Sequence, residues 1–167
     1  SNKHAIGINF MRFGVDDIPY TLDLIEPDGS VNYDNVRNFS VGNYGILLSY
    51  AYQIIPNLSV GATTKIVHNK AGSFAKSWGF GIDIGAMYKI KDWQIGITVK
   101  DITTTFNAWS YNFTDKEKAI LADTSNVIPK NSTEITLPRI QFGVAYTKTF
   151  KDKIELKAEL DWEITTD

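Results

Sequence analysis

Large apolar side chains alternate with small or charged ones through much of this chain. The pattern is clearest between residues 153 and 164, where one set of alternating positions is apolar and the set between them is ionisable. The apolar positions are Ile154, Leu156, Ala158, Leu160, Trp162 and Ile164, and the ionisable ones are Lys153, Glu155, Lys157, Glu159, Asp161 and Glu163. Because successive side chains of a β-strand point to opposite faces, this period of two predicts a strand with one apolar and one charged face. A helix would scatter the charges around its whole circumference.

The same alternation recurs often enough to predict about seven strands. The predicted strands are 5–15, 44–54, 60–68, 78–90, 93–99, 140–146 and 154–164. Runs 78–90 and 93–99 are separated by Lys91-Asp92, which is the pattern of a β-hairpin. Several runs are nearer the roughly 9–11 residues of membrane strands than the roughly 5–6 residues of soluble sheets. The sequence therefore predicts an all-β fold with an antiparallel sheet.

The predicted connections alternate in length along the chain. Short turns fall at 56–57, 91–92 and 151–152, whereas the longer links are 16–38, 68–73 and 103–134. Short turns at one rim and long loops at the other are typical of outer-membrane β-barrels. We therefore expect a single domain over 1–167, a transmembrane barrel segment whose long loops 16–38 and 103–134 lie on the outer side.

Two observations favour a membrane barrel over a soluble one of the lipocalin type, which also divides its faces. Trp78 and Tyr88 lie ten residues apart on one face, about 33 Å along a strand, which a tilt of ~45° projects to about 24 Å. That length matches the apolar band of about 25 Å between the aromatic girdles of such barrels. The six charges of run 153–164 also suit a wet lumen better than a packed interior. A soluble barrel would place Trp162 inside and these charges outside, and it remains the alternative.

Composition narrows the possible functions. The net charge of −2 and the pI near 5.7 provide no basic field for a phosphate backbone, so we expect no nucleic-acid partner. The most apolar stretch, 44–55, is interrupted by polar residues and is too short for a transmembrane helix. The chain has no cysteine, which excludes disulfides and thiolate chemistry.

An odd number of strands has a topological consequence. In a meander of seven antiparallel strands the first and last run in the same direction, and lipid does not tolerate an unpaired strand edge. We therefore expect the chain to be part of a longer barrel. The alternative is an eighth strand within 103–113.

Six segments resemble one known family. They are FGVDDIPYTLDL (13–24), FSVGNYGILLSYA (39–51), KIVHNKAGSF (65–74), SWGFGID (77–83), DITTTFNAW (101–109) and IPKNS (128–132). In this order they resemble the PorV-like outer-membrane proteins of the type IX secretion system, which belong to the FadL-type barrel superfamily. The resemblance implies a 14-stranded barrel of FadL type, of which about seven strands are present here. The family's small-residue-rich opening region and its closing aromatic strand are not found in the chain.

The resemblance also implies a function and a location. Such a protein is a non-catalytic component of the bacterial outer membrane. It receives cargo through C-terminal signal domains and passes it from the translocon to a surface attachment complex. Its implied partners are translocon and attachment-complex proteins, cargo domains and outer-membrane lipid. The alternative function is that of a FadL-like channel for hydrophobic small molecules.

No catalytic or metal-binding set is recognisable. The first long loop is acidic, but the spacing of its carboxylates is not that of an EF-hand. His4 and His68 have no partner at ligand spacing. Gly79-Phe80-Gly81 with Gly85 lies inside a strand and opens no helix, so it is no dinucleotide fingerprint. We expect no enzyme, no cofactor and no metal site.

The second long loop carries the only candidate partner-binding residues. Thr114 and Glu117 have the spacing of a capping box, which predicts a short helix over 115–121. Just before it lies an aromatic cluster: Phe106, Trp109, Tyr111 and Phe113. We interpret this cluster either as an extension of a strand or as a partner-binding surface.

Overall fold

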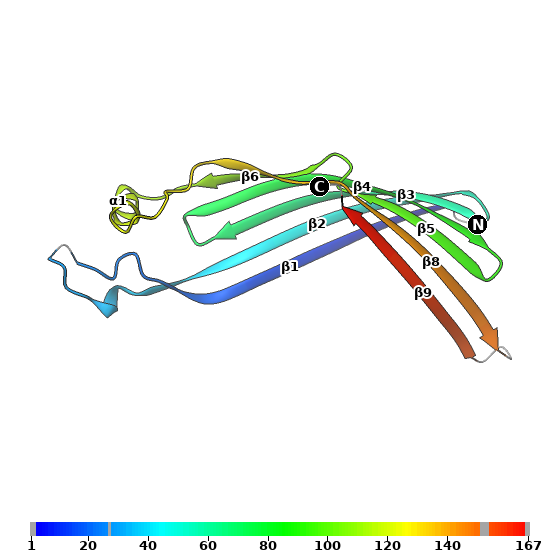
Figure 1. Cartoon of the computed structure of the whole chain (residues 1–167), viewed down its shortest axis with the longest axis horizontal. Coiled ribbons are helices and arrows are strands. Elements are labelled where there is room, and N and C mark those ends of the chain that lie inside the picture. Colours follow the sequence, from blue (N-terminus) through cyan, green and yellow to red (C-terminus); the bar gives the residue numbers. More distant parts are fainter. Residues whose placement is uncertain (1–2, 27, 151–153, 166–167) are drawn as a thin grey trace.

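The computed structural model describes residues 3–26, 28–150 and 154–165, and these form one antiparallel sheet that curls into a half-barrel (Figure 1). Its strands are β1 (His4–Tyr20), β2 (Arg37–Ile55), β3 (Leu58–Ala71), β4 (Ala75–Ile90), β5 (Trp93–Lys100), β6 (Thr105–Tyr111), β7 (Ser132–Thr136), β8 (Arg139–Phe150) and β9 (Ile154–Thr165). A 3₁₀ turn (Tyr33–Asn35) and one helix, α1 (Asp115–Asp123), complete the structure. The all-β antiparallel fold is confirmed. No helix within the described residues has the length and apolar character needed to span a membrane.

The described residues form nine strands, which occupy seven positions across the sheet. The order is β1-β2-β3-β4-β5-β8-β9, with β6 paired to β4 and β7 paired to β6. Strand β5 pairs with 84–90 of β4 and β6 with 75–80, so β5 and β6 follow one another along the same edge of β4. In the same way β8 continues the line of β7. The predicted strand at 103–113 therefore exists, but it lengthens the fifth position and adds no eighth one.

The long segments are shorter than predicted. The segment 103–134 contains β6 and the start of β7, which leaves a connection of 112–131, and 16–38 shrinks to 21–36. Strand β6 was predicted only as an alternative, because both of its faces carry aromatic side chains and its apolar and polar positions do not separate. The end of β1 was missed because a bulge between Val15 and Ile18 breaks its period. Both remaining long connections lie at one end of the sheet, and the turns β2–β3 and β4–β5 lie at the other (Figure 1). The predicted turn at 151–152 lies outside the described residues.

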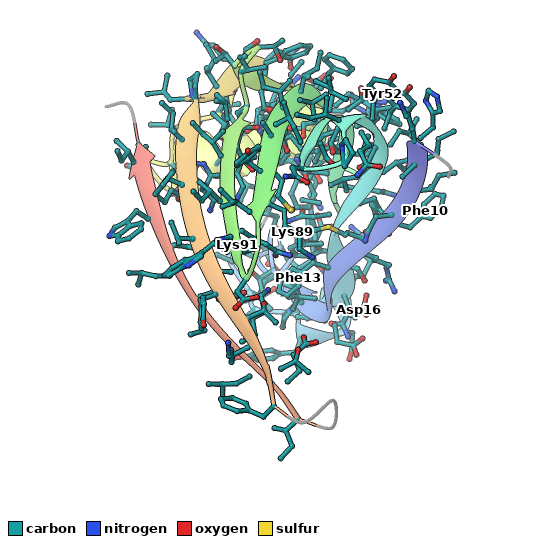
Figure 2. The ribbon with its side chains drawn as sticks, turned by 90° about the vertical axis from the view of Figure 1, so that its right-hand side faces the viewer. Phe10, Phe13, Asp16, Tyr52, Lys89 and Lys91 are labelled. Atoms are coloured by element: carbon teal, nitrogen blue, oxygen red, sulfur yellow. The ribbon has the colours of Figure 1, made fainter. Side chains whose placement is uncertain are left out.

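The two faces of the sheet differ throughout. We call them the convex face, which includes Trp78 and Phe80 of β4, and the concave face, which includes Ser77 and Gly79. On β1, Phe10 points away from the hollow of the sheet and Phe13 points into it (Figure 2). Strand register carries this division across all seven positions, since paired residues share a face.

The apolar convex face is not packed against anything in the described part of the chain. The side chains of Ile154, Leu156 and Leu160 are 65%, 60% and 57% exposed. The only buried hydrophobic residues described are Ala75 and Ala145, and both lie on the concave face. In the described strands the apolar set therefore lies on the outer side of the curled sheet, and the charged set lies on its inner side.

Candidate functional site: the rim at the long connections

The two long connections contact each other through charged groups. Lys116 of α1 lies 2.9 Å from Asp23, and Arg37 at the start of β2 lies 2.5 Å from the other oxygen of the same carboxylate. The Tyr20 hydroxyl donates a hydrogen bond to Glu117. The Arg37 guanidinium also lies over the Tyr20 ring, 5.3 Å from its centroid. These contacts join the segment 21–36 to the helix in 112–131, although the two are far apart in sequence.

Helix α1 forms for the reason that the sequence predicts. The Thr114 hydroxyl accepts a hydrogen bond from the Glu117 backbone N–H, and the Glu117 carboxylate accepts one from the Thr114 N–H. This capping box satisfies backbone donors that have no partner within the helix. The helix begins at Asp115 as predicted and ends at Asp123, two residues later than expected.

Six aromatic rings form a continuous row along the inner side of this rim. Trp109, Tyr111 and Phe113 are stacked with centroid separations of 6.0 and 6.3 Å. Phe113 stacks on Phe74 of the β3–β4 turn at 5.5 Å. The row ends with Phe39 and Tyr20, whose rings contact Phe74 and each other. Three of the four predicted aromatic residues are thus brought together.

Phe106 lies apart from that row. It pairs with Phe80 on the convex face and is 43% exposed, whereas Trp109 pairs with Ser77 on the concave face. The structure thus separates the predicted cluster into two surfaces because the spacing of 106 and 109 is odd. On the concave side, the Trp109 indole N–H donates a hydrogen bond of 2.7 Å to Glu134 of β7. That bond fixes the first ring of the row.

Tyr20, Phe39 and Phe74 are members of the row that sequence reasoning missed. They come from β1, β2 and the β3–β4 turn, and no local spacing connects them. Register accounts for their meeting, because Ile18 pairs with Phe39 and Ala71 with Ala75, which brings the ends of these strands to one rim. The sequence did contain one signal for these residues, because each of them lies near the long-loop end of a predicted strand.

A network of charged side chains lies on the concave face, next to the connection between β5 and β6. Lys65 is 2.8 Å from Asp83 and also forms an ion pair with Asp101, whose side chain is 3% exposed. Thr105 donates a hydrogen bond to Asp101, and Arg139 reaches it at 3.5 Å. Arg139 also lies 3.4 Å from Glu163 of β9. The network therefore joins β3, β4, β8 and β9, with Glu163 as its member from the last strand.

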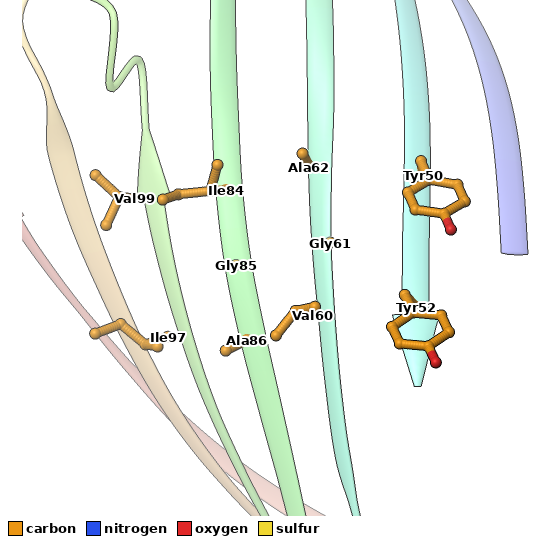
Figure 3. Close-up of a pocket in the computed structure, with 10 residues that line it drawn as sticks. All are labelled: Tyr50, Tyr52, Val60, Gly61, Ala62, Ile84, Gly85, Ala86, Ile97 and Val99. Carbon is orange, nitrogen blue, oxygen red and sulfur yellow. The ribbon is translucent and has the colours of Figure 1, made fainter. Parts of the chain in front are cut away.

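An open groove of about 480 Å³ lies on the opposite, convex face (Figure 3). Tyr50 and Tyr52 of β2 stand at one side of it, and Ile97 and Val99 of β5 stand at the other. The floor of the groove is formed by β3 and β4, which carry small residues such as Ala62 there. The groove is mostly apolar, and among the described residues that line it only the two tyrosines are ionisable. It therefore offers shape and apolar contact.

The sequence predicted no metal site because His4 and His68 have no partner at ligand spacing. In the structure both histidines make other contacts. His4 Nδ1 lies 2.8 Å from the Tyr50 hydroxyl. His68 stacks on Trp78 at 4.2 Å, and its Nδ1 lies 2.8 Å from the Ser77 carbonyl. Within the residues the structure describes, no three His, Cys, Asp or Glu side chains gather in a way that suits a metal ion.

Electrostatics at the rim favour ionised carboxylates. The hydrogen bond from Lys116 lowers the pKa of Asp23, and Arg37 adds to this effect against the opposing influence of partial burial. Burial alone would raise the pKa of Glu117, but the hydrogen bonds from Tyr20 and Thr114 outweigh it, so that pKa is lowered too. A lowered folded-state pKa stabilises the contact above the unfolded values, about 3.9 for Asp and 4.3 for Glu, and this stabilisation is lost as the pH falls through the folded values.

Acidification below about pH 4 is therefore expected to detach the segment 21–36 from α1. Amide hydrogen exchange, corrected for the intrinsic rate, should show lower protection of 21–36 and 115–123 at pH 3 than at pH 6. Lys116→Met is the control, because it removes a partner of Asp23 and should weaken the contact already at pH 6. Equal protection at both pH values would contradict the assignment of these contacts.

Comparison with protein-family models, with curated proteins and with solved structures finds no match for this chain.

Proposed function

We propose that this chain is part of a non-catalytic β-barrel of the bacterial outer membrane that acts in type IX protein secretion. The observation that carries the membrane part is the exposed apolar face, which runs without interruption over all seven strand positions. In water such a face is unfavourable, at roughly 25 cal/mol for each Å² of apolar surface. In a bilayer the same face contacts hydrocarbon, and the ions of the concave face meet an aqueous lumen.

Aromatic residues at both ends of the convex face support this orientation. Near the long-loop end, Tyr44, His68 and Trp78 lie in register on β2, β3 and β4, with their rings stacked. Near the short-turn end, Trp93 of β5 pairs with Tyr146 of β8 at a ring separation of 4.9 Å. Two such belts are typical of the membrane–water interfaces of a barrel.

The edges of the sheet agree with the proposal of a larger barrel. Strands β1 and β9 are the outermost strands of the described sheet. An unpaired edge is not stable in lipid. The proposal therefore requires further strands beside β1 and β9, as in a 14-stranded barrel of FadL type.

The rim at the long connections is the surface we assign to protein partners. It combines the aromatic row with charged groups of 21–36 and α1, and aromatic side chains are the commonest anchors of protein interfaces. The resemblance to PorV-like proteins supplies the kind of partner. The partners are cargo with a C-terminal signal domain, the translocon and the attachment complex.

The alternative of a FadL-like channel for hydrophobic small molecules receives less support. A pocket for such molecules is mostly apolar. The concave face instead carries Thr63, Lys65, Asp83 and Glu163, and the apolar groove is on the convex face.

Substitution of Trp109 and Tyr111 together by Ser is expected to weaken capture of cargo and translocon by the full-length protein at least tenfold, because the loss of one anchor aromatic costs a factor of that order or more. The measurement is a quantitative pull-down from detergent-solubilised outer membranes. Phe106→Ser is the matched control, since it removes an aromatic of the same strand from the opposite face. Capture that is unchanged in the double variant, or equally lost in the control, would contradict the assignment of the rim.

The same capture of cargo and translocon can be measured after the two long connections are replaced, and their bounds in the structure are 21–36 and 112–131. Deletion of 103–134 would remove β6 and part of β7 and thereby damage the sheet. Replacement of 21–36 and of 112–131 by Gly-Ser linkers leaves all strands intact. Loss of capture with retained folding supports the proposal, and retained capture with both linkers in place contradicts it.

A further inference from the structure

Two lysines face each other across β3 and β4 on the convex face. Lys70 pairs directly with Lys76, and the same row continues to Gly42 and Gly14 on one side and to Ser110 on the other. Like charges at directly opposite positions of an antiparallel pair destabilise the sheet. A negatively charged group between the two ammonium groups would remove this repulsion.

The part of the chain that the structure describes provides no such group. Arg12 lies on the same face, one row further from the rim, with its guanidinium 5.9 Å from the centroid of the Tyr44 ring. None of Arg12, Lys70 and Lys76 forms an ion pair with any residue that the structure describes. Asp16 and Asp17 lie at the bulge of β1, two strands away from Lys70, and they do not bridge the lysines. The patch is therefore positively charged and has no counter-ion among the residues that the structure describes.

The surface around Lys70 is hollowed on both sides. A hollow of about 500 Å³ extends over Lys76 and Ser110 to Asn112, and another of about 510 Å³ extends over Gly42 to Arg12. Gly42 leaves room for the Tyr44 ring, because a Cβ at this position would lie 3.0 Å from that ring and the ring would have to shift. The two hollows place ammonium, guanidinium, hydroxyl and amide groups around one indented region of the convex face.

The patch lies directly beside the aromatic belt at the long-loop end. The row of Arg12, Tyr44, His68 and Trp78 adjoins the row of Lys70 and Lys76. In a membrane barrel the aromatic belt marks the depth of the lipid head groups. Lysine and arginine beside it reach the phosphates of anionic lipids.

We infer that this patch binds the phosphate groups of an anionic lipid of the lipid A type, with one phosphate between Lys70 and Lys76 and with Arg12 and Ser110 at its flanks. The inference rests on the membrane part of the proposed function and deepens it. Charge complementarity selects a phosphorylated head group, and the position at the rim of the long loops, assigned to the outer side, selects a lipid of the outer leaflet. Acyl chains of that lipid then lie along the apolar convex face below the belt.

The test compares Lys70→Gln/Lys76→Gln with the wild-type full-length protein in detergent micelles. Lipid A binding is measured by native mass spectrometry and by the shift in unfolding temperature. The expected loss of affinity is roughly 30-fold, because each basic group at a membrane surface contributes about a factor of five. Without lipid the variant should be at least as stable as the wild type, since a repulsive pair is gone.

Lys89→Gln/Lys91→Gln is the matched control, because it removes two positive charges at the opposite end of β4 (Figure 2). It should bind lipid A like the wild type. Equal binding by the Lys70/Lys76 variant and the wild type would overturn the inference, as would equal binding of dephosphorylated lipid A. Equal affinity for phosphatidylglycerol would overturn the choice of lipid A. A protein that stays in solution without detergent would instead refute the proposed function.

Discussion

Ile97→Lys is expected to lower the free energy of unfolding in a bilayer by about 2–4 kcal/mol, the cost of a lysine near the middle of the lipid-facing side of a barrel. Ile97 is 47% exposed on the convex face, between Ala86 and Phe142 of the neighbouring strands. It lies four residues from Trp93, about 13 Å along the strand and about 9 Å in depth at a tilt of ~45°. That depth is well within an apolar band of about 25 Å.

Thr98→Lys provides the matched control for this prediction. Thr98 is the next residue of the same strand and faces the hollow, where its neighbours are Gly85 and Gln141. A lysine there meets water and should change the free energy of unfolding by less than about 1 kcal/mol. The measurement is reversible unfolding in denaturant from lipid vesicles. Equal effects of the two substitutions would contradict the membrane orientation of the sheet.

Asp101→Ala is expected to cost about 3 kcal/mol of stability, which is typical when one partner of a buried ion pair is removed. Asp101 is almost completely buried. It forms ion pairs with Lys65 and Arg139 and accepts a hydrogen bond from Thr105. Its loss leaves the Lys65 ammonium with Asp83 alone. Because Asp101 lies between β5 and β6 with a positive φ of 55°, the substitution should loosen β6 most.

Two further variants separate charge from hydrogen bonding at this position. Asp101→Asn keeps an acceptor for Thr105 but loses the charge, and it should lie between wild type and Asp101→Ala. Asp92→Asn removes the exposed pair with Lys148, 3.6 Å apart, and should cost less than about 1 kcal/mol. Unfolding in denaturant and hydrogen exchange of β6 are the measurements. A loss for Asp101→Ala no greater than that for Asp92→Asn would contradict the assigned role of the network.

The alternation of apolar and polar positions was sufficient to predict the strands whose two faces differ clearly. Strands 78–90 and 154–164 were predicted almost at their final bounds because their apolar and polar positions never exchange. The start of α1 was predicted because a capping box needs only Thr114 and Glu117, three residues apart. Strand β6 was predicted only as an alternative because the same test fails there, since Phe106 and Trp109 lie on its opposite faces.

The candidate site was predicted only in part. Trp109, Tyr111 and Phe113 do stack in one row. Phe106 belongs to the other face, and the three remaining rings of the row come from other strands. Their meeting depends on the register of four strands, which an isolated sequence pattern does not specify.

The sequence by itself determined the all-β class, the seven strand positions, the two unlike faces and the helix start, because each depends on neighbours within a few residues. Only the tertiary structure decided that β5 and β6 share one edge of β4. It placed Asp101 in contact with β3, β6 and β8 through Lys65, Thr105 and Arg139, and with β4 through its backbone N–H, which donates to Asp83. It also decided that Lys70 stands opposite Lys76. The physical reason is that hydrogen bonding between strands sets these distances, and residues far apart in the chain become neighbours only when the register is formed.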